Sequence, residues 1–407
     1  MAQVFDVAVL GGGLIGSAMA VSLARHGFQV ALVDPAPVDV RADPDFDGRA
    51  YAVAPGSRNL LDALGIWDQV KAHAQPISRI QVADKAEGPV AAAGLMFTPD
   101  EAGREQMGWI LEDRYLRPAL LAAVASAGVD HRAPAQAESV TRGSARADIN
   151  LADGSALAAR LVVACDGRRS AIARAAGICY LAWSYDQTGL VSAVSHALPH
   201  DGVAHQSFFP GGPFAVLPLP GDRSALVWSE RSARARDIAA MSDDAYMAEI
   251  STRLCGRLGA LELAGRRWAY PLNLALAQQF AVPRLVIAGD AAHGVHPIAG
   301  QGLNMGLRDI AALTEVLVDA AGLGLDLGQQ TVLAGYQHWR RFDATAMSLG
   351  MDGLNRLFST DVAPIQAIRN LGLKTVSHIP AARRFFAEAA SGTGEGAPKL
   401  LTGQRLD

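Results

Sequence analysis

The chain has 407 residues with 36 basic and 40 acidic side chains, a formal net charge of −4 at pH 7, and half of its residues are hydrophobic. This length allows two or three domains around a large core, which excludes a disulfide-stapled miniprotein and a disordered tail. The three cysteines form no C-x-x-C pair and no long basic run occurs, so we expect a cytoplasmic protein with no disulfide framework, no cysteine zinc site and no nucleic-acid partner.

The amino-terminal residues carry no pattern typical of a secretory signal. Met1 to Asp6 contain no basic residue, and the apolar stretch that follows is interrupted by three glycines. The sequence also lacks a run of about 18 apolar residues, the length that a membrane-spanning helix requires. We therefore expect a soluble protein.

The first 34 residues predict a strand-helix-strand unit. Val4–Leu10 is typical of a buried strand, and Phe28–Asp34 of a second strand. Between them, Leu14–His26 predicts a helix of small residues that is stopped by Gly27. The two strands of such a unit run parallel, so the carboxyl end of the first faces the amino end of the helix.

The turn between this strand and helix fits the pattern G-x-G-x-x-G. Gly11 would allow the tight turn, Gly13 would let the backbone approach a pyrophosphate, and Gly16 would allow close packing of helix on strand. The helix amino terminus offers free N–H groups to phosphates. Asp34 ends the second strand, where a carboxylate can accept the ribose hydroxyls of an adenosine. The unit predicts dinucleotide binding, but NAD and FAD share this pattern.

The middle of the chain predicts further helices and strands around two short motifs. Helices are expected over Ser57–Leu64 and Asp113–Ala127, and weak alternation over residues 76–110 favours strands. Two apolar strands run directly into glycine turns: Leu161–Cys165 into Asp166-Gly167, and Leu285–Ala288 into Gly289-Asp290.

Residues 179–280 predict a sheet-rich domain. Candidate strands separated by Gly-Pro turns are Gln206–Phe209, Phe214–Leu217 and Ala225–Ser229. From Leu303 the periodicity becomes helical and continues mainly so to Phe386, and the Gly-rich end from Ser391 is expected to be irregular.

The stretch after Gly289-Asp290 carries the most specific motif. It reads His296-Pro-Ile-Ala-Gly-Gln-Gly-Leu-Asn-Met-Gly-Leu-Arg-Asp309 and leads into an amphipathic helix. Gly300 and Gly302 would let the backbone approach a flat ring. A helix starting near Leu303 would direct the positive end of its dipole at that ring and stabilise the negative charge of a reduced flavin.

These residues resemble the flavin-dependent aromatic hydroxylases of the p-hydroxybenzoate hydroxylase type, and more narrowly the hydroxylases of ubiquinone biosynthesis. Cys165-Asp166-Gly167-Arg168-Arg169-Ser170, followed by Arg174, is similar to a second element of that family, and so is the carboxyl end from Arg369-Asn-Leu-Gly-Leu to Lys399-Leu-Leu-Thr-Gly403. The resemblance covers nearly the whole chain and is thinnest over residues 75–110 and 180–280.

The resemblance implies a set of FAD contacts. Gly11, Gly13, Gly16 and Asp34 would hold the ADP half, Asp290 the ribitol, and Asp166 would lie near the pyrophosphate. Gly300, Gly302, Leu303 and Asn304 would lie beside the isoalloxazine, with His296 and Pro297 near it and Arg49 and Arg117 as further contacts. No dedicated catalytic acid or base is assigned, because the chemistry of these enzymes is centred on the flavin.

The fold class implied is α/β, with a Rossmann-like FAD-binding domain, a sheet-rich substrate domain and a helical carboxyl-terminal region. We expect the FAD-binding domain to comprise residues 1–75, 105–178 and 281–330, and the substrate domain residues 76–104 and 179–280. Residues 331–407 would form the helical region.

By resemblance, the protein is an FAD-dependent monooxygenase that hydroxylates the aromatic ring of a polyprenylated phenol in ubiquinone biosynthesis. NAD(P)H and O2 are the co-substrates, and such enzymes act through a flavin C4a-hydroperoxide. The apolar tail of the substrate would suit a hydrophobic channel and a transient meeting with a membrane or with partner proteins of a biosynthetic complex. The sequence leaves open the oligomeric state, the ring position and the choice between NADH and NADPH.

Alternatives remain for the function and for the motifs. Another flavoenzyme of the same fold, a prenyl reductase or a halogenase, or a non-catalytic FAD-binding subunit would share these motifs, although the W-x-W-x-I-P element of halogenases is absent. Asp166-Gly167 alone is an ordinary turn. Asp290, His293 and His296 are spaced by three, but Pro297 and the glycines argue against a helical metal site, so no metal is expected.

Overall fold

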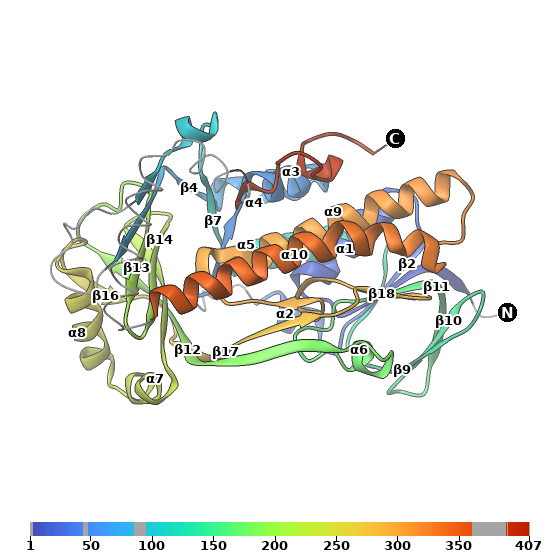
Figure 1. Cartoon of the computed structure of the whole chain (residues 1–407), viewed down its shortest axis with the longest axis horizontal. Coiled ribbons are helices and arrows are strands. Elements are labelled where there is room, and N and C mark those ends of the chain that lie inside the picture. The colour runs from blue at the N-terminus through green and yellow to red at the C-terminus, as the bar shows by residue number, and fades with distance from the viewer. Residues whose placement is uncertain (1–2, 44–47, 85–94, 360–387, 389, 407) are drawn as a thin grey trace.

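The computed structural model describes residues 3–43, 48–84, 95–359, 388 and 390–406 (Figure 1). Within these ranges the strands form sheets of eight, nine and three strands. The first sheet contains β1 (Val4–Leu10), β2 (Val30–Val33), β8 (Asp130–Arg132), β9 (Ala137–Arg142), β10 (Ala147–Leu151), β11 (Ala156–Ala164), β18 (Ala281–Val282) and β19 (Leu285–Ile287).

The first sheet confirms the predicted strand-helix-strand unit. β1 has the predicted bounds, α1 (Leu14–Arg25) ends one residue earlier than predicted, and β2 pairs with β1 in parallel, with Leu10 opposite Val33. β11 pairs in parallel with the other side of β1, with Ala164 opposite Leu10, and β19 pairs in parallel with β11. β8 pairs in parallel with the outer side of β2, so five parallel strands end at one edge of this sheet.

Helix α1 is enclosed by other elements, which explains its small residues. Gly16 to Leu23 are all buried. The helix packs against α5 (Asp113–Ser126) and α9 (Gln301–Gly322) as well as the sheet. A helix that is covered on several sides is apolar around its circumference, and small side chains allow its backbone to approach its neighbours.

The nine-stranded sheet is built mainly from the region predicted to be sheet-rich. Its strands are β5 (Arg79–Asp84), β6 (Leu95–Phe97), β12 (Tyr180–His196), β13 (Val203–Phe209), β14 (Gly212–Leu219), β15 (Arg223–Arg231), β16 (Leu261–Leu263), β17 (Trp268–Ala277) and β20 (His293–Gly294). The three strands predicted within residues 206–229 are confirmed as parts of β13, β14 and β15.

Two features of this region were not predicted. The 17-residue strand β12 lacks a clear alternation because a bulge between Ser184 and Gln187 shifts its register, and Asp186 there has a φ of 51°. The helices α7 (Ser232–Ala239) and α8 (Asp243–Leu254) interrupt the strands, and the Ser242 hydroxyl caps α8 by accepting a hydrogen bond from the Ala245 N–H. Sequence alternation alone did not reveal them.

A three-stranded sheet and the remaining helices complete the fold. The strands are β3 (Ala50–Val53), β4 (Gln75–Ile77) and β7 (Gly108–Glu112). The remaining α-helices are α2 (Val38–Arg41), α3 (Pro55–Ala63), α4 (Trp67–Val70), α6 (Ala171–Ala175) and α10 (Gln330–Phe358). Short 3-10 turns are η1 (Lys71–His73), η2 (Pro99–Ala102), η3 (Gly289–Ala291), η4 (Ile298–Gly300) and η5 (Lys399–Leu401).

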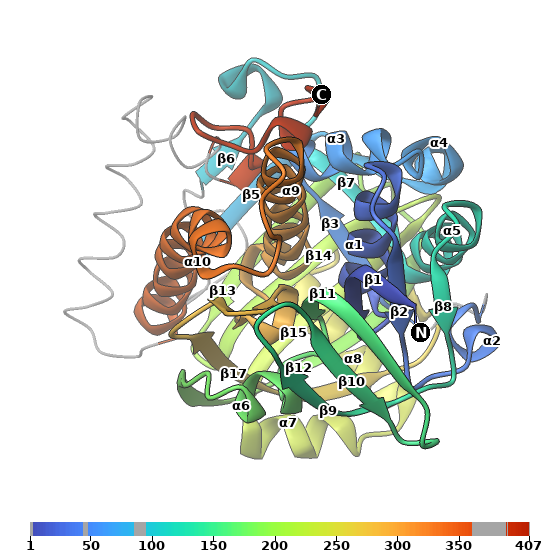
Figure 2. The same cartoon turned by 90° about the vertical axis from the view of Figure 1, so that its right-hand side faces the viewer.

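The carboxyl-terminal third confirms the predicted change to helix. Helices α9 and α10 lie side by side across the molecule (Figures 1 and 2), and η5 then packs Leu400 and Leu401 into the main core. The predicted helical structure over 360–386, with the family-like stretch 369–373, falls outside the described residues. Across the described helices, none is both long and apolar enough to cross a membrane.

Candidate active site

The carboxyl ends of four of these parallel strands bring the sequence motifs to one edge of the first sheet. Asp34 follows β2, the glycine turn starting at Gly11 follows β1, Asp166 follows β11, and Asp290 lies in η3 just after β19. Neighbouring strands of this set are in register up to their last residues. Segments that are up to 279 positions apart therefore meet where open α/β sheets bind their ligands.

Steric limits account for the glycines of the first turn. Gly11 has a φ of 106°, and a Cβ atom on it would lie 2.5 Å from the Cys165 carbonyl oxygen. A Cβ on Gly16 would lie 1.7 Å from the Gly11 carbonyl oxygen, and one on Gly12 would lie 2.3 Å from Asp34 Oδ2. Around Gly13, by contrast, nothing lies within 4 Å of the Cβ position. Side chains at Gly11, Gly12 and Gly16 would therefore clash with the protein, whereas the space beside Gly13 is open.

The Asp34 carboxylate provides the clearest sign of a missing partner. The residue is 1 % exposed, and its Oδ1 accepts hydrogen bonds from the Ala36 N–H at 2.7 Å and from Arg41 Nη2 at 3.0 Å. Its Oδ2 is buried and has no hydrogen-bond partner. Because an unpaired buried carboxylate oxygen is costly, the site fits a ligand that supplies donors, such as the ribose hydroxyls of a dinucleotide.

The second glycine motif contributes an open helix terminus. Gly300 adopts a left-handed conformation with a φ of 61°, and a Cβ on it would lie 2.8 Å from Ala52 Cβ. Helix α9 starts at Gln301, two residues before the predicted start. A Cβ on Gly302 would meet nothing within 4 Å. Gly300 thus closes the packing onto β3, whereas Gly302 leaves open space at a helix end whose N–H groups can bind a ligand.

The two glycine motifs are in direct contact. Cβ atoms on Gly289 and Gly306 would lie 3.0 Å and 2.5 Å from side-chain atoms of Ile15, which is part of the first motif. Ile15 therefore fixes the start of α1 against η3 and α9. This contact holds the two ends of the candidate cofactor site at a defined separation.

The side chain of Asn304 is occupied by the protein. Its Nδ2 donates to the carbonyl oxygens of Ala52 and Gly300, and its Oδ1 accepts from the Ala54 N–H and the Ser57 hydroxyl, at 2.7 to 3.1 Å. All four hydrogen-bonding positions of the amide are used. Asn304 thus joins α9 to β3 and α3, and a contact of Asn304 with the cofactor, which stays a prediction, would use its backbone. Leu303 beside it is half-buried against the core.

Arg49 and Arg117 meet at a carboxylate that the sequence analysis did not single out. Asp113 pairs with Arg117 through two hydrogen bonds of 2.9 Å and with Arg49 at 3.4 Å, and it accepts a hydrogen bond from the Tyr51 hydroxyl. Burial and the negative charge of Asp113 raise the pKa of Tyr51. The i,i+4 spacing of Asp113 and Arg117 is visible in the sequence, but the contact with Arg49 joins the residue before β3 to the first residue of α5.

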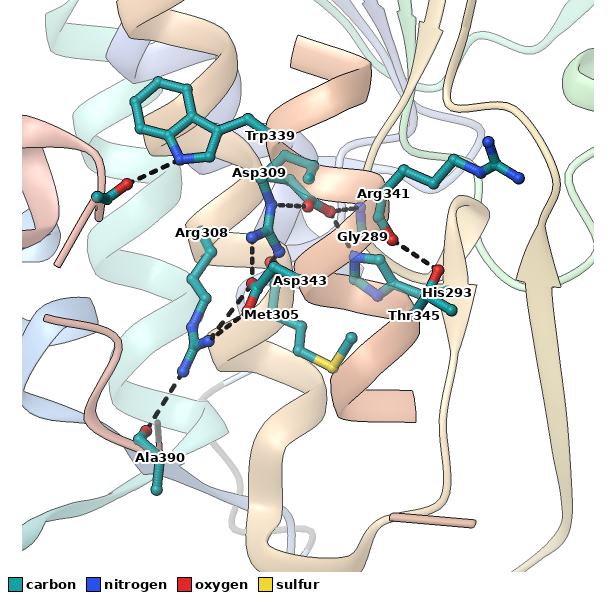
Figure 3. A network of polar contacts seen from close by, with 12 residues as sticks. Gly289, His293, Met305, Arg308, Asp309, Trp339, Arg341, Asp343, Thr345 and Ala390 are labelled. Atoms are coloured by element: carbon teal, nitrogen blue, oxygen red, sulfur yellow. Dashed lines mark hydrogen bonds and ion pairs between the residues drawn. The ribbon is translucent and has the colours of Figure 1, made fainter. Parts of the chain in front are cut away.

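A buried network of charged side chains on α9 and α10 is hydrogen-bonded to η3 (Figure 3). Asp309 on α9 accepts hydrogen bonds from the Gly289 N–H at 2.8 Å, His293 Nε2 at 2.6 Å and Arg340 Nε at 2.8 Å. Arg340 and Arg308 both pair with Asp343. Burial alone would raise the pKa of Asp309, but His293 and Arg340 hold that pKa below its usual value. The network links α9 and α10 to the turn that carries Asp290.

The remaining predicted residues lie at the same edge or beside it. Asp166 is exposed, and Asp290 pairs with Arg168 at 3.0 Å while keeping 46 % of its side chain exposed. His296 is fully buried, and Pro297 is half-buried. Among the side chains that the structure describes, no group of three or more His, Cys, Asp or Glu residues is arranged to hold a metal ion.

Comparisons with known proteins show the family to which the chain belongs. The family model described as an FAD binding domain matches residues 4–347. The ubiquinone hydroxylase UbiL of Rhodospirillum rubrum is 40 % identical over 99 % of this chain and 94 % of its own length, and the 3-demethoxyubiquinol 3-hydroxylase of Escherichia coli is 34 % identical over 96 % and 99 %.

A solved structure shows the same fold. The p-nitrophenol 4-monooxygenase PnpA of Pseudomonas putida superimposes with a TM-score of 0.78 at 19 % identity, covering 97 % of this chain and 100 % of its own. The α/β fold class and the family inferred from the motifs are confirmed. This chain belongs to the FAD-binding hydroxylases of ubiquinone biosynthesis and is a flavin-dependent aromatic hydroxylase.

Proposed function

We propose that the protein hydroxylates the aromatic ring of a polyprenylated phenol during ubiquinone biosynthesis, with NAD(P)H and O2 as co-substrates. The reaction consumes NAD(P)H, a proton, O2 and the phenol, and yields NAD(P)⁺, water and the ring-hydroxylated product. The observation that carries the proposal is at the edge of the first sheet, where Asp34 Oδ2 is unpaired and the space beside Gly13 is open. Ile15 packs this edge against η3 and α9, and the first turn of α9 leaves open space at Gly302. The names of the two relatives support the substrate class.

On this proposal, each part of FAD would have a contact on the chain. Asp34 would hold the adenosine ribose, the turn from Gly11 to Gly16 the pyrophosphate with Asp166 near it, and Asp290 the ribitol. Bound FAD would supply acceptance of a hydride from NAD(P)H and delivery of one oxygen atom from O2 to the ring. The first turn of α9, with Gly300 and Gly302, would stabilise negative charge on the ring system through its N–H groups. Arg49 and Arg117 would help to place β3 and α5 around it.

The two large sheets support a division of the chain into an FAD-binding domain and a substrate domain. We infer that the first sheet belongs to a discontinuous FAD-binding domain of residues 1–75, 105–178 and 281–330. The nine-stranded sheet would form the substrate domain of residues 76–104 and 179–280, and residues 331–407 a helical region. The apolar tail of the proposed substrate favours a hydrophobic channel and transient contact with a membrane surface or with biosynthetic partner proteins.

Product analysis tests the function. The FAD-loaded protein is expected to oxidise NAD(P)H faster when a short-chain polyprenylphenol is added, and mass spectrometry should find one atom from isotopically labelled O2 in the ring. A saturated prenyl chain without ring oxygen would instead identify a prenyl reductase, and a halogenated ring a halogenase. Flavin binding without substrate-stimulated NAD(P)H oxidation would identify a non-catalytic subunit.

The substitution Asp290→Ala is expected to weaken FAD retention while leaving the fold intact. It removes a half-exposed carboxylate and no core volume, because the Asp290 side chain contacts Arg168 at the surface of the site. Loss of a charged hydrogen bond to the ribitol should raise the dissociation constant of FAD roughly 10- to 100-fold. Flavin fluorescence titration measures this change, and full flavin occupancy in a purified variant with wild-type circular dichroism would contradict the assignment.

A further inference from the structure

The Arg168 side chain joins several segments beside the candidate flavin site. Arg168 follows β11, and its Nε donates a hydrogen bond to Asp290 Oδ2 at 3.0 Å. Its Nη2 donates to the Val295 carbonyl oxygen at 3.3 Å. The aliphatic part of the side chain lies against Gly294, because a Cβ atom on Gly294 would be 3.3 Å from both Arg168 Cγ and Cδ. One side chain therefore contacts η3, β20 and the loop that follows β20.

These contacts connect the two large sheets. β11 pairs with β1 in the first sheet, whereas β20 pairs with β17 in the nine-stranded sheet. Arg168 Nη1 also lies 3.5 Å from Asn273 Oδ1 on β17, at the outer limit of a hydrogen bond. Burial raises the pKa of Tyr270 on the same strand, and the positive charge of Arg168 partly offsets this rise. The guanidinium group thus lies at the contact between the two sheets.

Arg168 occupies only one oxygen of the Asp290 carboxylate. Within the part of the chain that the structure describes, the pair with Arg168 is the only hydrogen bond or ion pair of the Asp290 side chain, so Oδ1 stays available. A half-exposed aspartate without such a partner samples several rotamers, and fixing one of them when a ligand binds costs free energy. Because Arg168 already restricts the carboxylate, a ligand that binds to Oδ1 pays less of this cost.

The backbone of η3 is fixed independently of Arg168. The Gly289 N–H donates to Asp309 Oδ2 at 2.8 Å, and Asp309 belongs to the buried network on α9 and α10. Arg168, in contrast, contacts the side chain of Asp290 and is itself partly exposed. Loss of the Arg168 side chain should therefore release the carboxylate and leave the turn that carries it in place.

We propose that Arg168 is a positioning residue of the candidate FAD site, which orders the Asp290 carboxylate so that Oδ1 can accept a hydrogen bond from the ribitol. This inference rests on the flavin site of the proposed function, and it adds a residue that acts through Asp290. Since Arg168 also contacts Gly294 and Val295, it links the ribitol position to the nine-stranded sheet. No covalent bond forms or breaks in this role.

A double-mutant cycle on FAD affinity tests the role without turnover. FAD is titrated into the full-length apoprotein, and flavin fluorescence gives the dissociation constant for the wild type, Arg168→Met, Asp290→Ala and the double variant. Arg168→Met is expected to raise the dissociation constant about 3- to 10-fold, the cost of ordering one side chain on binding. In the Asp290→Ala background the same substitution should change it by less than about 2-fold, because no carboxylate remains to be ordered.

Two further variants separate positioning from general charge. Arg168→Lys keeps the charge and can pair with Asp290, but it lacks the planar fork that also reaches Val295. Its dissociation constant for FAD should therefore lie between those of the wild type and Arg168→Met. Arg169→Met removes a positive charge from the neighbouring exposed residue and should bind FAD as tightly as the wild type. Thermal unfolding of the Arg168→Met apoprotein should stay close to that of the wild type.

The outcomes that would overturn the proposal are distinct. Equal losses of affinity from Arg168→Met with and without Asp290 would mean that Arg168 acts on the cofactor directly. Wild-type affinity in Arg168→Met, or an equal loss in Arg169→Met, would also overturn it, and a marked loss of apoprotein stability would assign Arg168 a structural role instead. Unchanged FAD affinity in Asp290→Ala would end the roles of both residues. Product analysis tests ring hydroxylation separately, so the hydroxylase function stands or fails independently.

Discussion

Gly16→Ala is expected to destabilise the protein itself, whereas Gly13→Ala is expected to leave the apoprotein stable and to impair only FAD binding. The two glycines are three residues apart in one motif, but their surroundings differ. A methyl group on Gly16 would lie 1.7 Å from the Gly11 carbonyl oxygen, which is backbone and cannot rotate away. A methyl group on Gly13 would enter open space, and the φ of −68° at this position suits any L-residue.

The expected costs follow from these contacts. To accommodate the extra methyl group in Gly16→Ala, α1 must move away from β1 and Cys165, which should cost about 3 kcal/mol, the upper end of the usual range for overpacking. In Gly13→Ala the methyl group would occupy the space that we assign to the pyrophosphate, so FAD affinity should fall about tenfold or more. The free energy of unfolding of the apoprotein should then remain close to that of the wild type.

Thermal unfolding of the apoproteins and flavin titration separate the two effects. A lower unfolding temperature is expected for Gly16→Ala before any FAD is added, and a normal one for Gly13→Ala. If Gly13→Ala bound FAD as tightly as the wild type, the pyrophosphate would not lie at this turn. If Gly16→Ala unfolded normally, the close packing of α1 on the turn after β1 would be wrong.

The second large effect is expected for Asp309→Asn. The Asp309 carboxylate accepts three hydrogen bonds, from the Gly289 N–H, His293 and Arg340, and it is fully buried. The amide group of asparagine would present N–H donors to some of these donors, and Arg340 would lose a buried counter-charge. Breaking a buried charge network in this way typically costs about 3–5 kcal/mol. FAD affinity should also fall, because Gly289 precedes Asp290.

The pH dependence of unfolding provides an independent check. The pKa of Asp309 is lowered in the folded state, so the folded protein binds fewer protons at this site than the unfolded chain, whose aspartates titrate near pH 4. The contribution of Asp309 to stability is therefore complete above about pH 5 and is lost as the pH falls through the folded-state pKa. Asp309→Asn should unfold with a shallower dependence on pH in this acid range.

Chemical denaturation between neutral and acid pH measures both quantities. Asp68→Asn is the matched control, because Asp68 pairs with Lys71 at 2.7 Å in full solvent and such pairs contribute little. Equal stability of the two variants at neutral pH, or an unchanged acid limb in Asp309→Asn, would contradict the role assigned to the network.

Local sequence patterns predicted those parts of the site that depend on neighbours in the chain. The turn from Gly11 to Gly16, the strand ends before Asp166 and Asp290, and the start of α9 all follow from short-range periodicity and from glycine at required positions. The functional class came from an ungapped motif after His296. These features can be predicted from the sequence alone because a few adjacent residues determine the local backbone conformation.

The same local patterns could not predict contacts between segments that are distant in the sequence. The contact of Asn304 with the cofactor stays a prediction, but only the structure shows that its side chain is hydrogen-bonded to β3 and α3 and to Gly300. The flavin contacts of Arg49 and Arg117 also stay predictions, and only the structure shows that both side chains pair with Asp113. The strand β12 was missed because its bulge removes the alternation.

The sequence by itself determined the α/β class, the first parallel unit, the two glycine motifs and the chemistry of the cofactor. Only the tertiary structure decided that Ile15 joins the two motifs, that Asp34 keeps one buried oxygen unpaired, and that Arg168 pairs with Asp290. The physical reason is that backbone conformation is set largely by neighbours along the chain. The partner of a buried polar atom, in contrast, depends on which distant segment the packing of the sheets brings beside it.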